Sequence, residues 1–127
     1  MDLPALEDAV SGHLAELDLE ITGRLVDGNP TVQVFDAVQR PPQLLAVISD
    51  QCTDRFLLTL GRYQFQEFAY RPPDQAAVID TFCKIVTSHL RGEGRYGRDR
   101  PFFGLLGRSR PTYSIEVDGQ LFTSVGG

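Results

Sequence analysis

Few side chains in this sequence are suited to chemistry, and the two histidines, His13 and His89, are the first to consider. His89 falls on the apolar face of a predicted helix, near its C-terminal end, where the helix dipole favours the protonated imidazole. One interpretation makes it a general base. The other makes it a histidine at the edge of the core, bonded to a carbonyl group. We favour the second for His89, and more strongly for His13, because no nucleophile or orienting acid is spaced beside either.

The two cysteines do not resemble catalytic, disulfide or metal-binding cysteines. Cys52 stands between Asp50 and Asp54, and neighbouring carboxylates disfavour the thiolate that a nucleophile requires. Cys83 falls within the apolar arc of a predicted helix, where a cysteine behaves as a small hydrophobic residue. Two isolated cysteines match neither a disulfide framework nor a zinc pattern.

Two further patterns resemble chemical sites but do not indicate one. Residues 92–97 match G-x-G-x-x-G, but they follow a predicted helix, whereas a dinucleotide site needs a strand before these glycines and a helix after them. Carboxylates also come close together in three pairs, which we interpret as solvated surface residues: Asp50 with Asp54, Asp27 with Asp36, and Glu116 with Asp118. We find no calcium or transition-metal spacing, and we therefore expect no cofactor, no metal and no enzymatic activity.

An arginine-rich segment is the strongest candidate for function. Residues 91–110 hold six arginines, five glycines and three aromatic residues. Arginine and aromatic side chains anchor protein interfaces, and they also suit phosphate contact and base stacking. A third interpretation is internal, with the arginines neutralising the acidic half of the chain and the phenylalanines entering the core. The candidate partner-binding residues in this segment are Arg95, Tyr96, Arg98, Arg100, Phe102 and Phe103.

The first half of the chain carries charge of the opposite sign. Residues 1–60 hold ten acidic side chains and three arginines. Such runs are usually solvated surface, but an acidic surface of this size also steers association with a basic partner. We take Glu16, Asp18, Asp27 and Asp36 as candidates for that contact. The acidic balance of the whole chain, with a pI near 4.9, argues against nucleic acid as the main partner.

The pattern of the chain predicts a single α+β domain over residues 1–127. Apolar residues at spacings of three and four predict helices over about 3–18 and 74–91, the second with Asp74 as its N-cap and Gly92 at its C-terminal end. Short strands are expected over about 20–70, with turns at 27–30 and 61–62. A loop follows over about 92–111, with Arg95 and Tyr96 allowed in a short strand. Asp118-Gly119 predicts a terminal hairpin over about 112–124. We expect an antiparallel sheet of about five to seven strands with both helices on one face.

Composition restricts the class of protein further. The apolar fraction of 42% and the charged fraction of 23% are those of a folded globular chain. No apolar run is long enough to span a bilayer, and the start of the chain lacks the basic region of a signal peptide. We therefore expect a cytoplasmic protein without a membrane partner. Eleven arginines against one lysine suggest a GC-rich bacterial coding sequence.

Together these features favour a non-catalytic protein-binding module. The leading hypothesis is a small bacterial inhibitor, of the immunity or toxin–antitoxin kind, that binds and occludes a basic partner. One alternative is a chaperone for a secreted effector. Another is a protein or enzyme that binds a small anionic ligand through Arg95, Arg98 or Arg100, with His89 assisting. The class-level comparison with immunity proteins and chaperones is an analogy of size, charge and fold.

Overall fold

A computed structural model describes residues 1–51, 54–99 and 109–126. Its two helices and eight strands follow in the order α1 (Leu3–Leu14), β1 (Leu19–Val26), β2 (Asn29–Asp36), β3 (Gln43–Gln51), β4 (Arg55–Leu60), β5 (Tyr63–Phe68), α2 (Pro72–Leu90), β6 (Arg95–Asp99), β7 (Arg110–Val117) and β8 (Gln120–Val125). Every strand pairing is antiparallel, which confirms the predicted α+β class.

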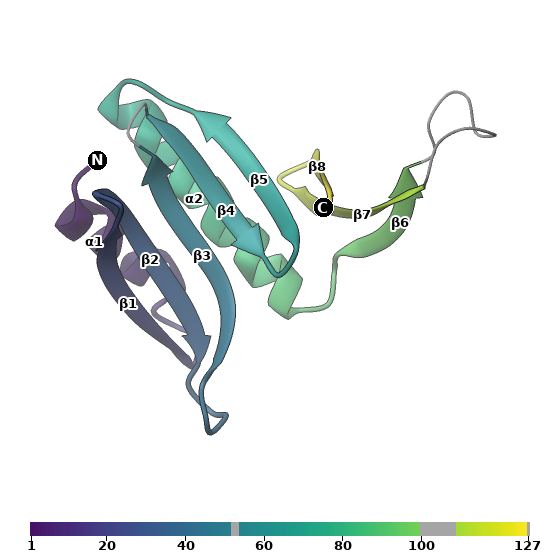
Figure 1. Ribbon diagram of the computed structural model, residues 1–127, viewed down its shortest axis with the longest axis horizontal. Coiled ribbons are helices and arrows are strands. Elements are labelled where there is room, and N and C mark those ends of the chain that lie inside the picture. Colours follow the sequence, from purple (N-terminus) through teal and green to yellow (C-terminus); the bar gives the residue numbers. More distant parts are fainter. Residues whose placement is uncertain (52–53, 100–108, 127) are drawn as a thin grey trace.

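The eight strands form two sheets. Five of them make a meander in the order β1-β2-β3-β4-β5, and the last three make a second sheet in the order β6-β7-β8. Both helices lie on the same face of the five-stranded sheet, as predicted, with α1 behind β1 and β2 and α2 behind β3 to β5 (Figure 1). Among the described residues, no helix lies on the opposite face of that sheet.

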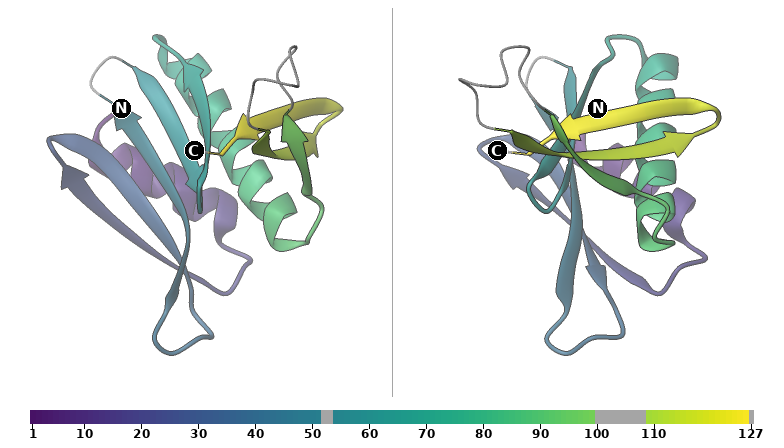
Figure 2. Two further views of the ribbon diagram at one scale, coloured as in Figure 1. Left: turned by 45° about the vertical axis from the view of Figure 1, so that its right-hand side comes forward. Right: turned by 90° about the vertical axis from the view of Figure 1, so that its right-hand side faces the viewer.

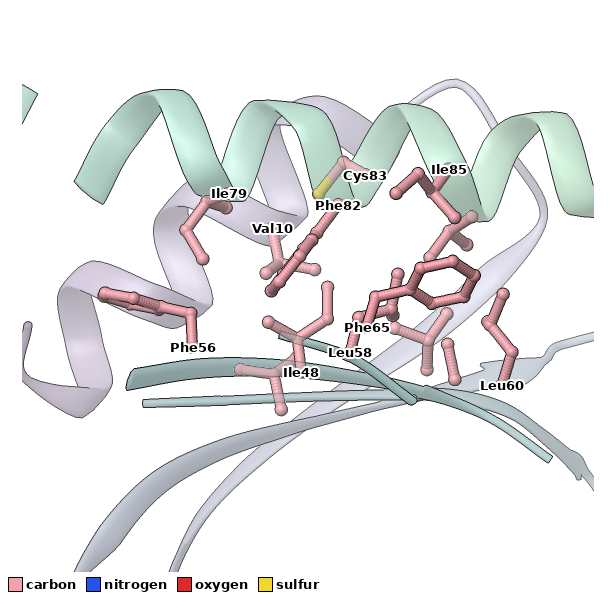
Figure 3. Packing of buried hydrophobic residues seen from close by; sticks show 14 of the residues in the cluster. Val10, Ile48, Phe56, Leu58, Leu60, Phe65, Ile79, Phe82, Cys83 and Ile85 are labelled. Atoms are coloured by element: carbon pink, nitrogen blue, oxygen red, sulfur yellow. The ribbon is translucent and has the colours of Figure 1, made fainter. Parts of the chain in front are cut away.

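The core lies between α2 and the centre of the five-stranded sheet. Phe82 and Ile79 project from α2 toward Ile48 of β3 and Leu58 of β4, and Val10 of α1 reaches the same cluster (Figure 3). These side chains are fully or almost fully buried. Because buried residues alternate along β4 and the first half of β5, these strands present one apolar face to the helices.

The small sheet runs across α2 and the edge of β5. Figure 2 shows β7 and β8 crossing both elements. The Ser124 hydroxyl of β8 accepts a hydrogen bond from the Gln64 amide at 2.9 Å and donates one to the Gln64 carbonyl at 2.7 Å. Tyr113, Ile115 and Val117 of β7 belong to the same buried cluster as the core of the main sheet. The small sheet is therefore an integral part of the fold.

The predicted hairpins are confirmed. Asp118 and Gly119 both have positive φ, as the mirror-image two-residue turn requires, and they join β7 to β8. Asp27 and Gly28 form a turn of the same kind between β1 and β2. Gly61 also has positive φ at the turn between β4 and β5. Each of these turns depends on the backbone preference of its own residues, which is why a local pattern identifies them.

Two details of the predicted helices are wrong. The first helix ends at Leu14 instead of Asp18, and the chain turns there because the Leu17 amide bonds to the Leu14 carbonyl at 3.1 Å. The second helix starts at Pro72, with Arg71 in the N-cap position, so Asp74 lies in the first turn and pairs with Arg71 at 3.0 Å. Prolines fit the first turn because its amides have no helical partner. Gly92 does end this helix with positive φ.

The predicted loop over 92–111 contains more strand than expected. All of Arg95–Asp99 forms β6, and β7 already begins at Arg110. The pairing runs from Arg95 opposite Ser114 to Asp99 opposite Arg110. Tertiary pairing therefore overrides the weak strand preference of a segment rich in glycine and arginine.

Replacing Phe82 by alanine tests the location of the core. Phe82 is 1% exposed, and we expect Phe82→Ala to lower the free energy of unfolding by about 3–5 kcal/mol, because it removes buried apolar surface and leaves a cavity. Urea denaturation followed by circular dichroism measures this. Leu121→Ala, at a side chain 65% exposed, should change stability by less than about 0.5 kcal/mol. Similar losses for the two variants would contradict the proposed core.

Candidate functional site

The acidic residues named from the sequence lie on α1, β1 and β2, at two separate places. Asp18 and Asp36 are neighbours, because Leu19 pairs with Asp36 and the Ala37 amide bonds to the Asp18 carbonyl at 3.2 Å. Glu16 precedes Asp18 just beyond the end of α1. Asp27 lies in the turn at the other end of the β1–β2 hairpin. The structure thus brings three of the four candidates to one end of this hairpin and leaves Asp27 at the opposite end.

These carboxylates have no ion-pairing partner within the described part of the chain. Residues 1–36 contain eight acidic side chains and one arginine. Asp2 caps α1 through a bond from the Ala5 amide, and Asp36 accepts a bond from the Val38 amide. None of the eight takes part in an ion pair among the described residues. Most of them, including Glu16, Asp18 and Asp27, are exposed.

The arginines named from the sequence are divided between the two faces of β6. Arg98 and Tyr96 share the face that carries Tyr113, since Tyr96 pairs with Tyr113 and Arg98 with Pro111. Arg95 points the other way, into a shallow recess that it shares with Glu93, Glu116 and Asp118. Arg100, Phe102 and Phe103 lie outside the described residues. Arg95 and Arg98 therefore do not form a single cationic site.

Internal neutralisation, the third interpretation of the arginine-rich segment, does not hold for the described arginines. Arg110 pairs with Asp99 of the same small sheet at 2.9 Å. Arg91, Arg95 and Arg98 form no ion pair with any described residue. Figure 1 shows β6 at the opposite end of the long axis from α1 and β1. The described arginines of β6 thus lie apart from α1 and β1 in the folded molecule.

An aromatic cluster joins the two sheets, and it was not foreseen from the sequence. The ring of Tyr113 on β7 lies 4.9 Å from that of Tyr96, 5.4 Å from that of Tyr63 on β5, and 5.4 Å from that of His89 on α2. These centroid distances are those of favourable aromatic contacts. Three of the four tyrosines in the chain meet here, brought together by elements far apart in the sequence.

His89 is bonded to a tyrosine hydroxyl instead of the carbonyl that we expected. Its Nδ1 atom lies 2.5 Å from the Tyr113 hydroxyl oxygen. Burial lowers the pKa of His89 below its ordinary value of 6.5, which favours the neutral imidazole. Burial, with a smaller contribution from Tyr96, raises the pKa of Tyr113 to about 12. Two neutral rings therefore share this hydrogen bond at neutral pH.

A pocket of about 340 Å³ opens beside this cluster. Tyr63, Tyr96, Tyr113 and His89 form one side of it, and it is completed by Gln43, Leu44, Leu45, Leu60, Gly61 and Arg62. Its volume falls within the range of small-ligand pockets, and its lining is mainly apolar and aromatic with a few polar groups, as such pockets require. No aspartate or glutamate is among the described residues that line it.

Cys83, His13 and Asp50 have structural roles, and Cys52 lies outside the described residues. Cys83 is buried, and burial, with a smaller effect of Asp80, raises the pKa of its thiol to about 12, which agrees with the hydrophobic role we expected. His13 lies 3.4 Å from Asp80 and links α1 to α2. Asp50 accepts a bond from the Met1 amine at 2.8 Å. Among the described residues, no cluster of potential ligands could hold a metal ion, and no helix is long and apolar enough to cross a membrane.

Comparison with known proteins assigns neither a family nor a function to the chain. The chain matches no family model, no curated protein and no solved structure. Any function must therefore be argued from the geometry of the molecule itself.

The stability of the protein should fall as the pH drops below about 6.5. The unfolded chain binds a proton at His89 more readily than the folded chain, so protonation favours unfolding below the unfolded-state pKa. Urea denaturation in steps from about pH 7.5 to 5.5 measures this, and His89→Gln should make the decline shallower. In His13→Gln, which replaces a more exposed histidine, stability should still decline as the pH falls. An unchanged decline in His89→Gln would show that other groups cause it.

Proposed function

We propose that the protein is a non-catalytic binding module whose acidic surface, formed by α1, β1 and β2, docks against a basic region of another protein. The observation that carries this proposal is the set of exposed carboxylates without ion pairs in the described residues. An unpaired acidic surface attracts a cationic partner over a long range and raises the rate of productive encounter.

Exposed apolar side chains accompany the carboxylates on this surface. Leu25, which is 61% exposed, lies close in sequence to Asp27, and Val38, which is 72% exposed, lies close to Asp36. An interface typically surrounds apolar contacts with a polar rim. Each end of the β1–β2 hairpin therefore offers both an apolar contact and a charged group that can orient the partner.

The form of this function that fits best is inhibition by occlusion. A basic active site, such as one that binds nucleic acid, presents the charge that this surface complements, and a bound acidic protein would cover it. Glu16, Asp18 and Asp36 would contact the partner at one end of the hairpin, and Asp27 at the other. The protein then needs no catalytic group of its own.

Charge-neutralising variants at the two ends of the molecule test this proposal. The tagged protein is used to isolate a partner from its source cells at low salt, and association with the purified partner is followed by surface plasmon resonance. We expect the association rate to fall about tenfold or more as salt rises. Glu16→Gln with Asp18→Asn should also lower the rate at low salt.

The matched control is the pair Glu93→Gln and Glu116→Gln. It changes the net charge equally, but both side chains are exposed in the small-sheet part of the molecule. Equal effects of the two double variants, or an association rate indifferent to salt, would contradict docking through the acidic surface. A partner that binds only as an extended, unfolded chain would instead indicate a chaperone.

A further inference from the structure

The pocket beside the aromatic cluster is lined by residues that take no part in the proposed docking through the acidic surface. It lies between the β4–β5 turn, the start of β3, the C-terminal end of α2 and the small sheet. The candidate docking residues Glu16, Asp18, Asp27 and Asp36 do not line it. The two sites therefore use different residues, although they adjoin in the sheet, where Asp36 pairs with Gln43 of the pocket.

One ring of the cluster remains largely in solvent. Tyr113 is buried and Tyr63 is nearly so, whereas Tyr96 is 70% exposed although its ring centre lies only 4.9 Å from that of Tyr113. A tyrosine ring buried on one side and free on the other can stack on a planar molecule at little cost in side-chain entropy, because its partners already hold it. The tyrosines thus form a preorganised aromatic wall.

Part of the remaining lining is apolar, and the pocket has room for a ring system. Leu44, Leu45 and Leu60 contribute aliphatic side chains. A dry cavity of roughly 150 Å³ holds benzene, so a pocket of about 340 Å³ can receive a molecule with one or two rings. Gln43 and Arg62 supply polar groups that can fix its orientation.

The charges around the pocket favour an anion. Arg62 lines it, and Arg98 stands two residues from Tyr96 on the same face of β6. The described lining itself holds no carboxylate, although Asp36 lies beside Gln43 on the neighbouring strand. A cation would stack on the same rings, but the two guanidinium groups would repel it.

We propose that the pocket lined on one side by Tyr63, Tyr96, Tyr113 and His89 binds a small planar aromatic anion. The rings provide stacking surface, and Arg98 and Arg62 attract the carboxylate or similar group. The bond between His89 and Tyr113 holds the central ring in place, so these two residues position the aromatic wall.

Titration of the full chain with naphthalene-2-carboxylate, followed by NMR of the tyrosine ring protons, tests this proposal. We expect the signals of Tyr63, Tyr96 and Tyr113 to shift in a saturable way, while those of Tyr70 stay unchanged. Tyr96→Ala should weaken binding at least tenfold. Tyr70→Phe is the matched control, because Tyr70 is also 70% exposed and does not line the pocket; it should bind as the native protein does.

The contribution of charge is tested on the two faces of β6. Arg98→Gln should weaken binding of the carboxylate severalfold, while Arg95→Gln, on the opposite face, should not. Naphthalene-2-carboxamide and cyclohexanecarboxylate should both bind more weakly than the planar anion, since one lacks the charge and the other the aromatic ring.

Several results would overturn the proposal. It fails if no saturable shift appears at millimolar naphthalene-2-carboxylate, or if Tyr96→Ala, still folded by its amide spectrum, binds as tightly as Tyr70→Phe. Equal affinity for the carboxamide would refute the preference for an anion, and equal affinity for cyclohexanecarboxylate would refute stacking. Loss of partner association in the acidic-surface variants would leave these results unchanged, so the two proposals can fail separately.

Discussion

The packing of α2 between two sheets is the constraint on which the rest of the structure depends. Phe82 and Ile79 bury one side of the helix against β3 and β4 (Figure 3). Its other contacts hold the small sheet, because Lys84 bonds to Asp118 at 2.7 Å and the His89 ring bonds to Tyr113. The exposed Lys84 pair adds little stability by itself, so burial around Tyr113 must supply most of the attachment.

This attachment also determines where charge appears on the surface. Because the small sheet crosses α2 and the edge of β5, β6 extends away from α1 and β1, and Arg95 and Arg98 cannot reach the carboxylates of residues 1–36 (Figures 1 and 2). The molecule thus exposes an acidic surface on α1, β1 and β2, and an aromatic pocket between the start of β3, the β4–β5 turn, α2 and the small sheet. The two proposed binding activities use different residues of these surfaces, which adjoin where Asp36 pairs with Gln43.

The sequence was sufficient for features that depend on neighbouring residues. The turns at Asp27-Gly28 and Asp118-Gly119, and the end of α2 at Gly92, follow from residues that accept positive φ. The aromatic pocket could not be foreseen, because Tyr63, His89 and Tyr113 meet only when the small sheet docks. The separation of Arg95 from Arg98 likewise depends on the register between β6 and β7. The acidic candidates could be named from the sequence. Which of them lie together could not, because that depends on the pairing of β1 with β2.

Amide hydrogen exchange in Gly94→Ala tests most directly whether the aromatic cluster attaches the small sheet. A methyl group at Gly94 would collide with the Tyr113 ring, whereas one at Gly12 would meet open space, so Gly12→Ala is the matched control. We expect Gly94→Ala to lose protection in β7 and β8 by about tenfold or more, while β2 to β4 stay protected. Native-like protection of β7 and β8 in Gly94→Ala would contradict this account of the fold.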